Sequence, residues 1–400
     1  MDFKDTPEES DFRQDVRDFL KAELPDRFRG EPGAAYGGGG RGDMRSRFEE
    51  MKEWRKKLAD KGWIAPAWPT EYGGAGFSVM QQFIMNEELA EARAPQVGGM
   101  GVSMIGPTLI IHGSDDQKQE HLSRILTGEV QWCQGFSEPE SGSDLASLQT
   151  KAVRDGDDYV INGQKIWTSG AQFAHWMFML ARTDPEAPKH KGISYFMLDM
   201  KSPGVTVRPL VNMAGNAMFN EVFFEDVRVP AKNLVGEENR GWYIGTTTLD
   251  FERSSIGSAV GLRLSVESMI AYATEHANDG QSTLGLAPTL RYELADRLLE
   301  ANVSKMLSYR VVTMQNKGLV PNYEASMTKL FASELNQRIA GTGMKMTGLY
   351  GQLLSGSEWA PARGRYGSSY IQTVASTIAG GTSEVQRNII SQRGLGLPRD

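Results

Sequence analysis

The pattern of apolar and polar positions divides the chain into a helical part, a strand-like part and a second helical part. Between residues 6 and 126, apolar residues recur at intervals of three and four, as on one face of an amphipathic helix. The first stripe follows Thr6, an expected N-cap with Glu9 three residues later, and ends at Pro25. Its apolar members are Phe12, Val16, Phe19, Leu20 and Leu24. The first part is therefore predicted to be helical.

Further helical patterns occupy residues 48–58, 79–93 and 109–126, and the segments between them contain helix breakers. Residues 30–42 include a run of four glycines, which predicts a loop. Residues 62–77 combine prolines and paired glycines with aromatic residues, which predicts a packed connection rather than a helix. The apolar stretch 101–107 indicates the start of another helix.

Between about residues 131 and 240 the period of the apolar positions changes to two, which is typical of β-strands. Strand-like runs lie at residues 159–161, 176–180, 193–198, 205–207 and 221–224. Turn dipeptides are expected at Asp155-Gly156, Asn162-Gly163 and Pro203-Gly204. Helical patterns return after residue 241, at 290–307 and 330–339. The predicted fold class is α+β, with an N-terminal α-helical domain (1–129), a middle antiparallel β domain (130–240) and a C-terminal helical bundle (241–400).

Composition narrows the classes of function. With 400 residues, of which 40% are hydrophobic, the chain can bury a large core, and its net charge of -7 with no basic block argues against nucleic acid as a partner. The only cysteine, Cys133, excludes a disulfide within the chain and is expected to be a buried small apolar side chain. The acidic N-terminus lacks an apolar or arginine-rich leader, and no apolar run is long enough for a membrane span, so a cytoplasmic protein is expected.

Residues 132–169 carry the densest set of candidate binding groups. Hydroxyls and backbone N–H groups gather in one short polar segment, where they can converge on a planar or anionic ligand. Its members are Ser137, Ser141, Gly142 and Ser143. One predicted strand later, Trp167 places a large flat indole beside the hydroxyls of Thr168 and Ser169. A flavin needs such a wall with hydrogen-bond partners at its edge. Each piece alone is also compatible with a surface turn or a core aromatic residue.

Together, the segments FSEPESGSD (136–144) and KIWTSG (165–170) resemble the acyl-CoA dehydrogenase family. The resemblance continues through FEDVRVP (224–230) to GGTSEVQR (380–387), and therefore covers nearly the whole chain. It implies a C-terminal four-helix bundle, bound FAD and no metal ion. The implied reaction converts an acyl-CoA thioester to the trans-2-enoyl-CoA, after which an electron-transfer flavoprotein accepts the electrons. Homotetramers and heterotetramers both occur among the relatives.

The resemblance also implies roles for individual residues. The residues implied at the isoalloxazine and pyrophosphate are Gln134, Phe136, Ser137, Gly142, Ser143, Trp167, Thr168 and Ser169. Thr382, Ser383 and Glu384 are implied near the adenine half of FAD. The residues implied at the acyl-CoA are Ser143, Phe251, Arg253 and Gly380.

The α-proton of a thioester is a weak acid, so its removal needs a positioned base, and a carboxylate whose pKa is raised by burial suits this task. Many relatives carry this glutamate just before the Gly-Thr of the C-terminal motif, where this chain has Gly380. Others carry it in a Leu-Asp-x-Glu-Arg segment on an earlier helix, which matches residues 249–253. We therefore expect Glu252 to be the base. The alternative for Glu252 is an exposed helix carboxylate paired with Arg253 or a residue one turn away.

Two departures from the family pattern affect the expected assembly. Relatives clasp the flavin of a neighbouring subunit with an Arg-Phe-Gly and a Gln-x-x-Gly-Gly motif, where this chain has residues 278–281 and 345–349 without these patterns. A partner chain that completes the flavin site is therefore one hypothesis, as in relatives that act on steroid side chains. An oxidase or monooxygenase on the same scaffold is a second hypothesis, and a non-enzymatic DNA-associated relative is a third. Gly380 either makes room for a bulky acyl group or meets a backbone requirement of its loop.

Overall fold

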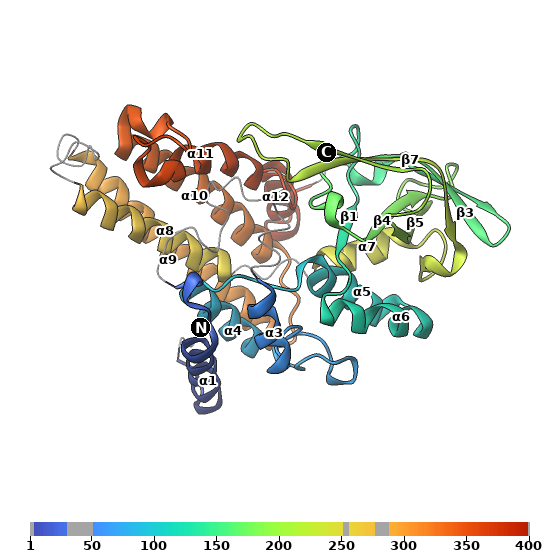
Figure 1. Cartoon of the computed structure of the whole chain (residues 1–400), viewed down its shortest axis with the longest axis horizontal. Helices are drawn as coiled ribbons and strands as arrows, with labels where there is room; N and C mark the ends of the chain where they lie inside the picture. Colours follow the sequence, from blue (N-terminus) through green and yellow to red (C-terminus); the bar gives the residue numbers. More distant parts are fainter. Residues whose placement is uncertain (1–3, 30–50, 251–255, 277–287, 399–400) are drawn as a thin grey trace. The chain divides into compact units, whose positions relative to one another are not determined.

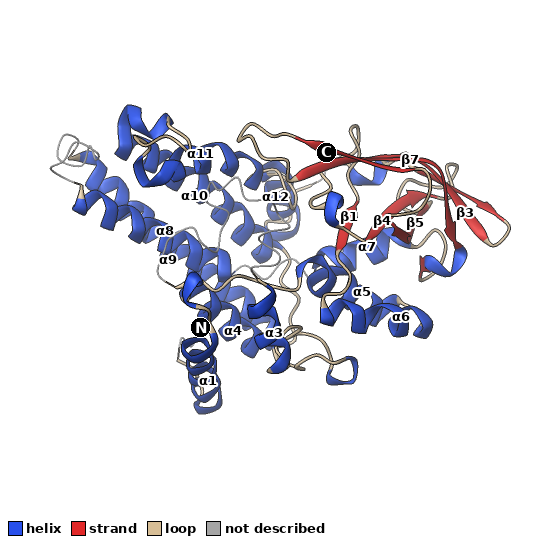
Figure 2. Ribbon diagram, viewed as in Figure 1, coloured by secondary structure: helices blue, strands red, loops and turns tan. Residues whose placement is uncertain are grey.

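The computed structural model describes residues 4–29, 51–250, 256–276 and 288–398 (Figure 1). The chain divides into two compact units. The helical unit comprises Met1–Arg47, Phe77–Gln96 and Ser254–Asp400, and the sheet unit comprises Phe48–Gly76 and Val97–Arg253. Every strand of the described residues belongs to the sheet unit (Figure 2).

The helical unit packs its helices around an apolar core. Its described α-helices are α1 (Pro7–Glu23), α4 (Val79–Glu91), α8 (Ile256–Glu275), α9 (Thr289–Asn316), α10 (Tyr323–Thr347), α11 (Arg365–Ser376) and α12 (Ser383–Ile389). Its short 3₁₀ and π turns are η1 (Asp26–Phe28), η8 (Gly348–Gln352), η9 (Pro361–Gly364) and η10 (Ile390–Gly394). Val266, Leu294 and Leu335 lie in a core shared by α8, α9 and α10. The helical patterns at 290–307 and 330–339 are thereby confirmed.

The start of α1 is the capping box that the sequence predicts. The Thr6 hydroxyl accepts a hydrogen bond from the Glu9 backbone N–H at 3.2 Å, and the Glu9 carboxylate accepts one from the Thr6 N–H at 2.8 Å. Val16 and Leu20 of the predicted stripe are buried. The local sequence therefore specifies both where this helix begins and which face it buries.

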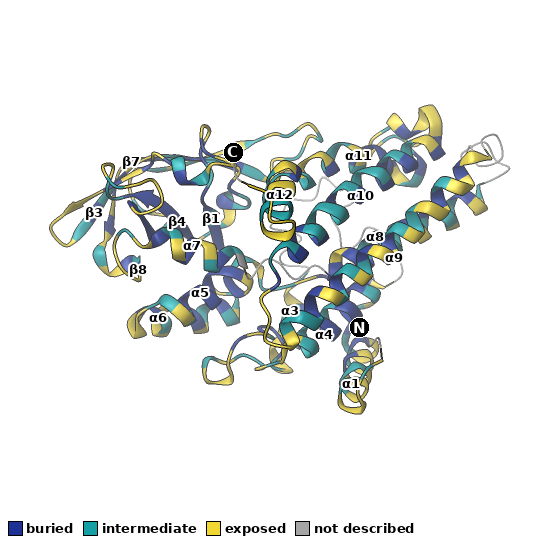
Figure 3. Ribbon diagram, turned by 180° about the vertical axis from the view of Figure 1, so that it is seen from behind, coloured by how far each residue is buried: buried dark blue, intermediate teal, exposed yellow. Residues whose placement is uncertain are grey.

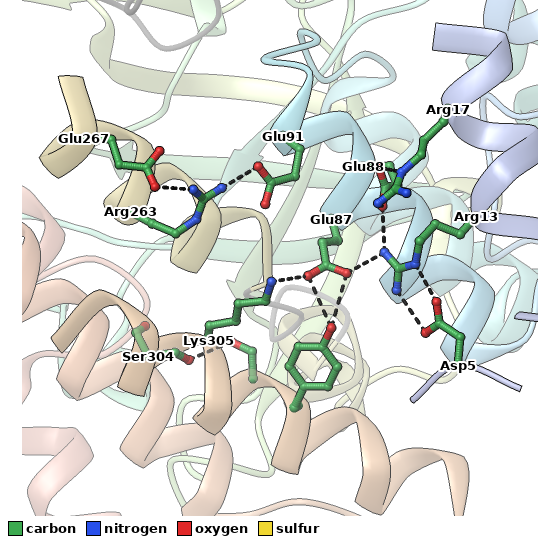
Figure 4. Close-up of polar contacts among 12 residues, drawn as sticks. Asp5, Arg13, Arg17, Glu87, Glu88, Glu91, Arg263, Glu267, Ser304 and Lys305 are labelled. Carbon is green, nitrogen blue, oxygen red and sulfur yellow. Dashed lines mark hydrogen bonds and ion pairs between the residues drawn. The ribbon is translucent and has the colours of Figure 1, made fainter. Parts of the chain in front are cut away.

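A buried ion network joins α1, α4 and α9 within the helical unit (Figure 4). Arg13 bonds the carboxylates of Asp5, Glu87 and Glu88 at 2.6, 2.7 and 2.7 Å. Glu87 also bonds Lys305 at 2.7 Å, and its side chain is only 4% exposed. Burial opposes the ionisation of Glu87, but the hydrogen bonds from Lys305 and Arg13 outweigh it and hold its pKa below the usual value. The predicted helix stripes gave no sign of this network, because its members lie far apart in the sequence.

The sheet unit contains one mostly antiparallel sheet. Its strands are β1 (Trp132–Gly135), β2 (Lys151–Asp155), β3 (Asp158–Lys165), β4 (Trp176–Arg182), β5 (Ile193–Asp199), β6 (Val205–Leu210), β7 (Phe219–Pro230) and β8 (Leu234–Val235). The order across the sheet is β6-β7-β3-β2-β4-β5-β8, and β1 pairs with β4. The β1–β4 and β2–β4 pairings are parallel. Each predicted strand-like run falls within one of these strands.

The centre of the sheet is buried on both faces. All residues of β4 after Trp176, and all residues of β5 before Asp199, are buried (Figure 3). Cys133 of β1 belongs to the same core and is fully buried, as predicted, and burial raises the pKa of its thiol. This rigid centre supports the loops that follow β1 and β3.

One predicted turn is wrong. Asn162-Gly163 does not separate two strands but lies inside β3, where the register with β7 shifts between Ile161 and Gly163. Gly163 has a φ of 143°, and a Cβ there would lie 2.7 Å from the Thr150 hydroxyl oxygen. The dipeptide therefore forms a β-bulge, because a side chain does not fit at this close approach.

The helices of the sheet unit are α3 (Lys52–Asp60), α5 (Gly106–His112), α6 (Asp115–Thr127) and α7 (Gly241–Asp250). Its short turns are η2 (Thr70–Tyr72), η3 (Gly101–Ile105), η4 (Leu145–Ser147), η5 (Ala171–Phe173) and η6 (Ala231–Asn233). The helical pattern expected over 109–126 is confirmed with one break, since α5 ends at His112 and Ser114 caps α6 by accepting from the Gln117 N–H at 3.2 Å. A serine with glutamine three residues later is a capping box that the apolar pattern obscures.

The expected helix start at 101–107 is instead the π-helical turn η3, which leads into α5. Pro107 has no N–H for the helical ladder, and Trp68 fills the space beside Gly106, where a Cβ would lie 1.9 Å from the indole. The Trp68 N–H donates to the Val102 carbonyl at 2.9 Å, so residues 62–77 form the packed connection that the sequence predicts. None of the helices in the described part of the chain is long and apolar enough to cross a membrane.

Candidate functional site

The structure brings together the two segments predicted to bind a flavin. Lys165, the last residue of β3, is fully buried and donates from Nζ to the Phe136 carbonyl at 3.0 Å and to the Glu138 carboxylate at 2.7 Å. The Ile166 N–H donates to the Ser137 carbonyl at 2.9 Å. Residues 136–144 and 165–170 therefore form one structure, which we call the cradle.

The polar loop of the cradle is closed by its own backbone. Glu138 and Ser141 exchange two backbone hydrogen bonds of 3.1 and 3.0 Å, and the Glu138 carboxylate accepts from the N–H groups of Gln149 and Thr150 at 2.6 and 3.0 Å. Gly142 and Ser143 remain exposed, and no atom of the described part of the chain lies within 4 Å of a Cβ built on Gly142. A phosphate or another polar ligand can therefore reach the loop backbone.

Buried charges support this loop. Burial opposes the ionisation of Glu138, but the charge of Lys165 outweighs it and lowers the pKa of the carboxyl group. Burial lowers the pKa of Lys165, and Glu138 limits that fall. Arg182, also buried, donates to the carbonyls of Ala146 and Leu148 at 2.6 and 3.3 Å.

Trp167 has an unusual backbone for a bulky residue. Its φ is 59°, in the left-handed region, the residue is 59% exposed, and its ring makes an edge-on contact with Phe219 at a centroid distance of 5.9 Å. Asn220 holds the next residue in place: its carbonyl accepts from the Thr168 N–H at 3.1 Å, and its amide donates to the Thr168 carbonyl at 2.8 Å. Strain of this kind persists where the surroundings impose it, often at ligand sites.

Three buried polar atoms of the cradle region have no hydrogen-bond partner among the described residues: Gln134 Nε2, Thr168 Oγ1 and Asn220 Oδ1. Buried polar groups nearly always form hydrogen bonds. Three that lack a partner in a region with an exposed indole therefore indicate a binding site for a polar ligand. A flavin ring, which is planar and carries donors and acceptors at its edge, fits this set. The residues present therefore fit FAD.

Three other residues predicted to contact the flavin differ in burial. Phe136 is buried, with its ring 5.8 Å from Phe178 and 6.1 Å from Tyr195, so its side chain belongs to the core. Ser137 and Ser169 are partly exposed within the cradle.

The C-terminal motif lies in the helical unit. Gly380 and Gly381 have φ values of 64° and 85°, and their carbonyls accept from the Gln386 amide at 2.9 Å and from Lys329 Nζ at 2.6 Å. Among the described residues, a Cβ on Gly380 would meet only Lys329 Cε at 3.9 Å, so the positive φ rather than a steric limit favours glycine there. This supports the backbone explanation for Gly380.

The residues after Gly381 form a helix start. The Thr382 hydroxyl caps α12 by accepting from the Val385 N–H at 3.2 Å. Ser383 Oγ is buried and has no partner within the described part of the chain. Glu384 is exposed in the first turn, and hydrogen bonds from its own backbone N–H and from Thr382 lower its pKa.

Phe251, Glu252 and Arg253 lie outside the described residues, as do residues 278–281. Helix α7, which ends just before Phe251, is anchored in the sheet unit. Thr248 is fully buried, with Oγ1 2.8 Å from the Thr108 hydroxyl oxygen and 3.4 Å from that of Tyr195.

Sequence reasoning missed this hydroxyl chain and the supporting roles of Lys165 and Asn220. Thr108 within an otherwise apolar stretch is the one signal that could have suggested a buried hydroxyl. Among the described residues, no group of His, Cys, Asp or Glu side chains is arranged to hold a metal ion.

Three family models cover most of the chain. Residues 6–129 match "Acyl-CoA dehydrogenase, N-terminal domain", residues 133–227 match "Acyl-CoA dehydrogenase, middle domain", and residues 239–395 match "Acyl-CoA dehydrogenase, C-terminal domain".

Individual relatives agree with these models. The chain is 38% identical to acyl-CoA dehydrogenase IpdE1 of Mycobacterium tuberculosis over 97% of this chain and 99% of the relative. Among solved structures, it resembles the Tcur3481-Tcur3483 steroid ACAD with a TM-score of 0.84 and 34% identity over 100% of both chains. It also resembles the ChsE4-ChsE5 complex from Mycobacterium tuberculosis, with a TM-score of 0.81 and 34% identity, again over 100% of both chains.

Proposed function

The chain belongs to the acyl-CoA dehydrogenase family, and we propose from this premise that Glu252 is the base of its FAD-dependent dehydrogenation of an acyl-CoA thioester. FAD held at the cradle would supply the acceptor for the hydride that leaves the β-carbon. Gln134, Thr168 and the exposed backbone of the polar loop would hold FAD at the cradle. Trp167 would form a wall of the ring site.

One contact carries the assignment of Glu252. Helix α7 packs against the cradle, because a Cβ on Gly245 would lie 3.8 Å from the Phe136 ring and 3.3 Å from Leu180. Thr248 anchors the same helix one turn later. Glu252 follows the last residue of α7, Asp250, by two positions in the sequence, within the segment 249–253 that matches the base segment of relatives. A carboxylate that reaches the thioester can take the α-proton while the thioester oxygen receives hydrogen bonds.

Anaerobic bleaching of bound FAD by a panel of acyl-CoA thioesters tests this function. Glu252→Gln keeps the size of the side chain but removes the base, so we expect the rate of flavin reduction to fall by ~10³, within the ~10²–10⁴ that positioned proton transfer contributes. Glu71→Gln is the matched control, because its exposed carboxylate belongs to none of the segments implied at FAD or acyl-CoA and should leave the rate nearly unchanged. Near-normal bleaching by Glu252→Gln would place the base elsewhere.

We further propose that the chain works with a related partner chain. Apolar side chains are exposed along one side of α9, at positions 292, 299, 303 and 306, and along α11 at 370 and 374. Such stripes on long helices are typical of surfaces covered in an assembly. The departures at 278–281 and 345–349, and the likeness to the ChsE4-ChsE5 complex, support a partner that differs from this chain. Flavin-loaded, active protein from the chain expressed alone would contradict this assembly.

For the substrate, we propose an acyl group that carries a bulky ring system, since one similar structure is called a steroid ACAD. The substrate panel should therefore include a steroid-derived acyl-CoA beside straight and branched chains, and a clear preference for short straight chains would contradict the proposal. An electron-transfer flavoprotein is the proposed acceptor, and rapid reoxidation of the reduced flavin in air would point to an oxidase instead.

A further inference from the structure

The buried ion pair beneath the cradle needs an explanation. The Lys165 and Glu138 side chains are 0% and 7% exposed, and their charged atoms lie 2.7 Å apart. Burying such a pair costs desolvation energy that the mutual attraction often fails to recover, and apolar replacements are often equally stable or more so. Stability alone is therefore a poor reason to place lysine here.

The pair forms hydrogen bonds with the backbone of the cradle and with the backbone of residues 149 and 150, which follow the polar loop. Lys165 immediately precedes residues 166–169 and donates to the Phe136 carbonyl at the start of the polar loop. Glu138 lies within that loop and accepts from the N–H groups of Gln149 and Thr150. Thr150 in turn donates to the Gln164 carbonyl at 3.1 Å. The pair thus fixes the end of β1, the polar loop and the end of β3 relative to one another.

A second buried cation lies near the pair. Arg182 bonds the backbone carbonyls of Lys189, Ala146 and Leu148, and the negative charges of Glu138 and Asp184 both favour its ionised form. Burial and the positive charge of Arg182 both lower the pKa of Lys165, and Glu138 opposes them.

We propose that Glu138 and Lys165 are positioning residues for FAD: the pair holds the Phe136–Ser137 backbone against residues 166–169, and thereby sets the affinity of the cradle for the cofactor. Neither side chain touches the cofactor in this account, so each acts through the backbone that it holds. The inference rests on the proposed flavin site.

The test compares Lys165→Met with a control variant that also loses stability but lies elsewhere in the sheet unit. Lys165→Met keeps an unbranched side chain but removes the charge and its two hydrogen bonds. Val227→Ala is the control, because Val227 is fully buried in the sheet core and belongs to neither segment of the cradle. Glu138→Gln is a milder variant, since its amide oxygen can still accept one backbone N–H.

Two readouts on the full chain separate positioning from general stability. Hydrogen exchange of the FAD-free chain should rise over residues 136–150 and 166–170 in Lys165→Met, and should stay at the wild-type level there in Val227→Ala. The dissociation constant for FAD, measured well below the melting temperature, should rise ~10–100-fold in Lys165→Met, the size of effect that supporting residues have at metal sites. We expect less than a threefold rise in Val227→Ala, and an intermediate rise in Glu138→Gln.

An FAD affinity of folded Lys165→Met and Glu138→Gln within threefold of wild type would overturn the positioning role, while leaving the proposed function intact. If Lys165→Met does not fold, Glu138→Gln decides on the same criterion. A wild-type chain that binds no FAD, alone or in its native assembly, would instead overturn the proposed flavin site itself.

Discussion

Removal of Arg13 should strongly destabilise the helical unit, because it leaves buried carboxylates with fewer partners. The guanidinium bonds Asp5, Glu87 and Glu88, and the side chains of the two glutamates are only 4% and 6% exposed. Breaking a buried ion pair by deleting one partner typically costs about 3–5 kcal/mol. Glu87 retains Lys305 and Glu88 retains Arg17, so we expect Arg13→Met to cost about 3 kcal/mol, at the lower end of that range.

Arg228→Met is the matched control, since it removes the same group from an exposed position. Arg228 also bonds two carboxylates, those of Asp155 and Asp158, but its side chain is 57% exposed. Exposed ion pairs contribute little, so this change should cause no resolvable loss. Urea unfolding followed by hydrogen exchange in α1 and α4 would report the helical unit separately from the sheet unit. If Arg13→Met costs no more than Arg228→Met, the account of the network is wrong.

Three further predictions concern single positions. The folded-state pKa of Glu87 lies below its unfolded value of 4.5. The contribution of Glu87 to stability is therefore complete above pH 4.5 and is lost as the pH falls through the folded-state pKa. Glu87→Gln should make the free energy of unfolding less dependent on pH in this acid range, as measured by unfolding curves at a series of pH values. Thr248→Val should lower the free energy of unfolding by about 1–2 kcal/mol, because it removes the hydroxyl that lies 2.8 Å from that of Thr108. A lower thermal midpoint with an unchanged far-UV circular dichroism spectrum would show this loss. Gly380→Ala should lower the free energy of unfolding by only about 1–2 kcal/mol, through left-handed backbone strain. Gly364→Ala should lower it clearly more, because the alanine Cβ at position 364 would lie 2.4 Å from a backbone nitrogen. Equal unfolding midpoints for these two variants would contradict the steric argument.

The sequence predicted the features that depend on local pattern. The capping box of Thr6, the long helices α9 and α10, and the strands around β4 and β5 follow from spacing within a few residues. The motifs at 136–144 and 165–170 also predicted the two segments that the hydrogen bonds of Lys165 and Ile166 join in the cradle.

Features that depend on contacts between distant residues could not be predicted. A lysine at the end of a strand is usually exposed, yet Lys165 is fully buried because a carboxylate 27 residues away meets it. The pairing of Arg13 with Glu87 spans 74 residues. The left-handed Trp167 backbone depends on Asn220 of another strand, and no periodic pattern encodes that contact.

The most direct test of the account follows the α-hydrogen itself. A 3-thia-acyl-CoA has sulfur in place of the β-carbon, so it has no β-hydride to lose, and any exchange of its α-hydrogen with deuterated solvent reports the base alone. We expect rapid exchange by the FAD-loaded wild-type chain and exchange slower by ~10³ in Glu252→Gln. Equal exchange rates in the two proteins would contradict the assignment of Glu252 as the base.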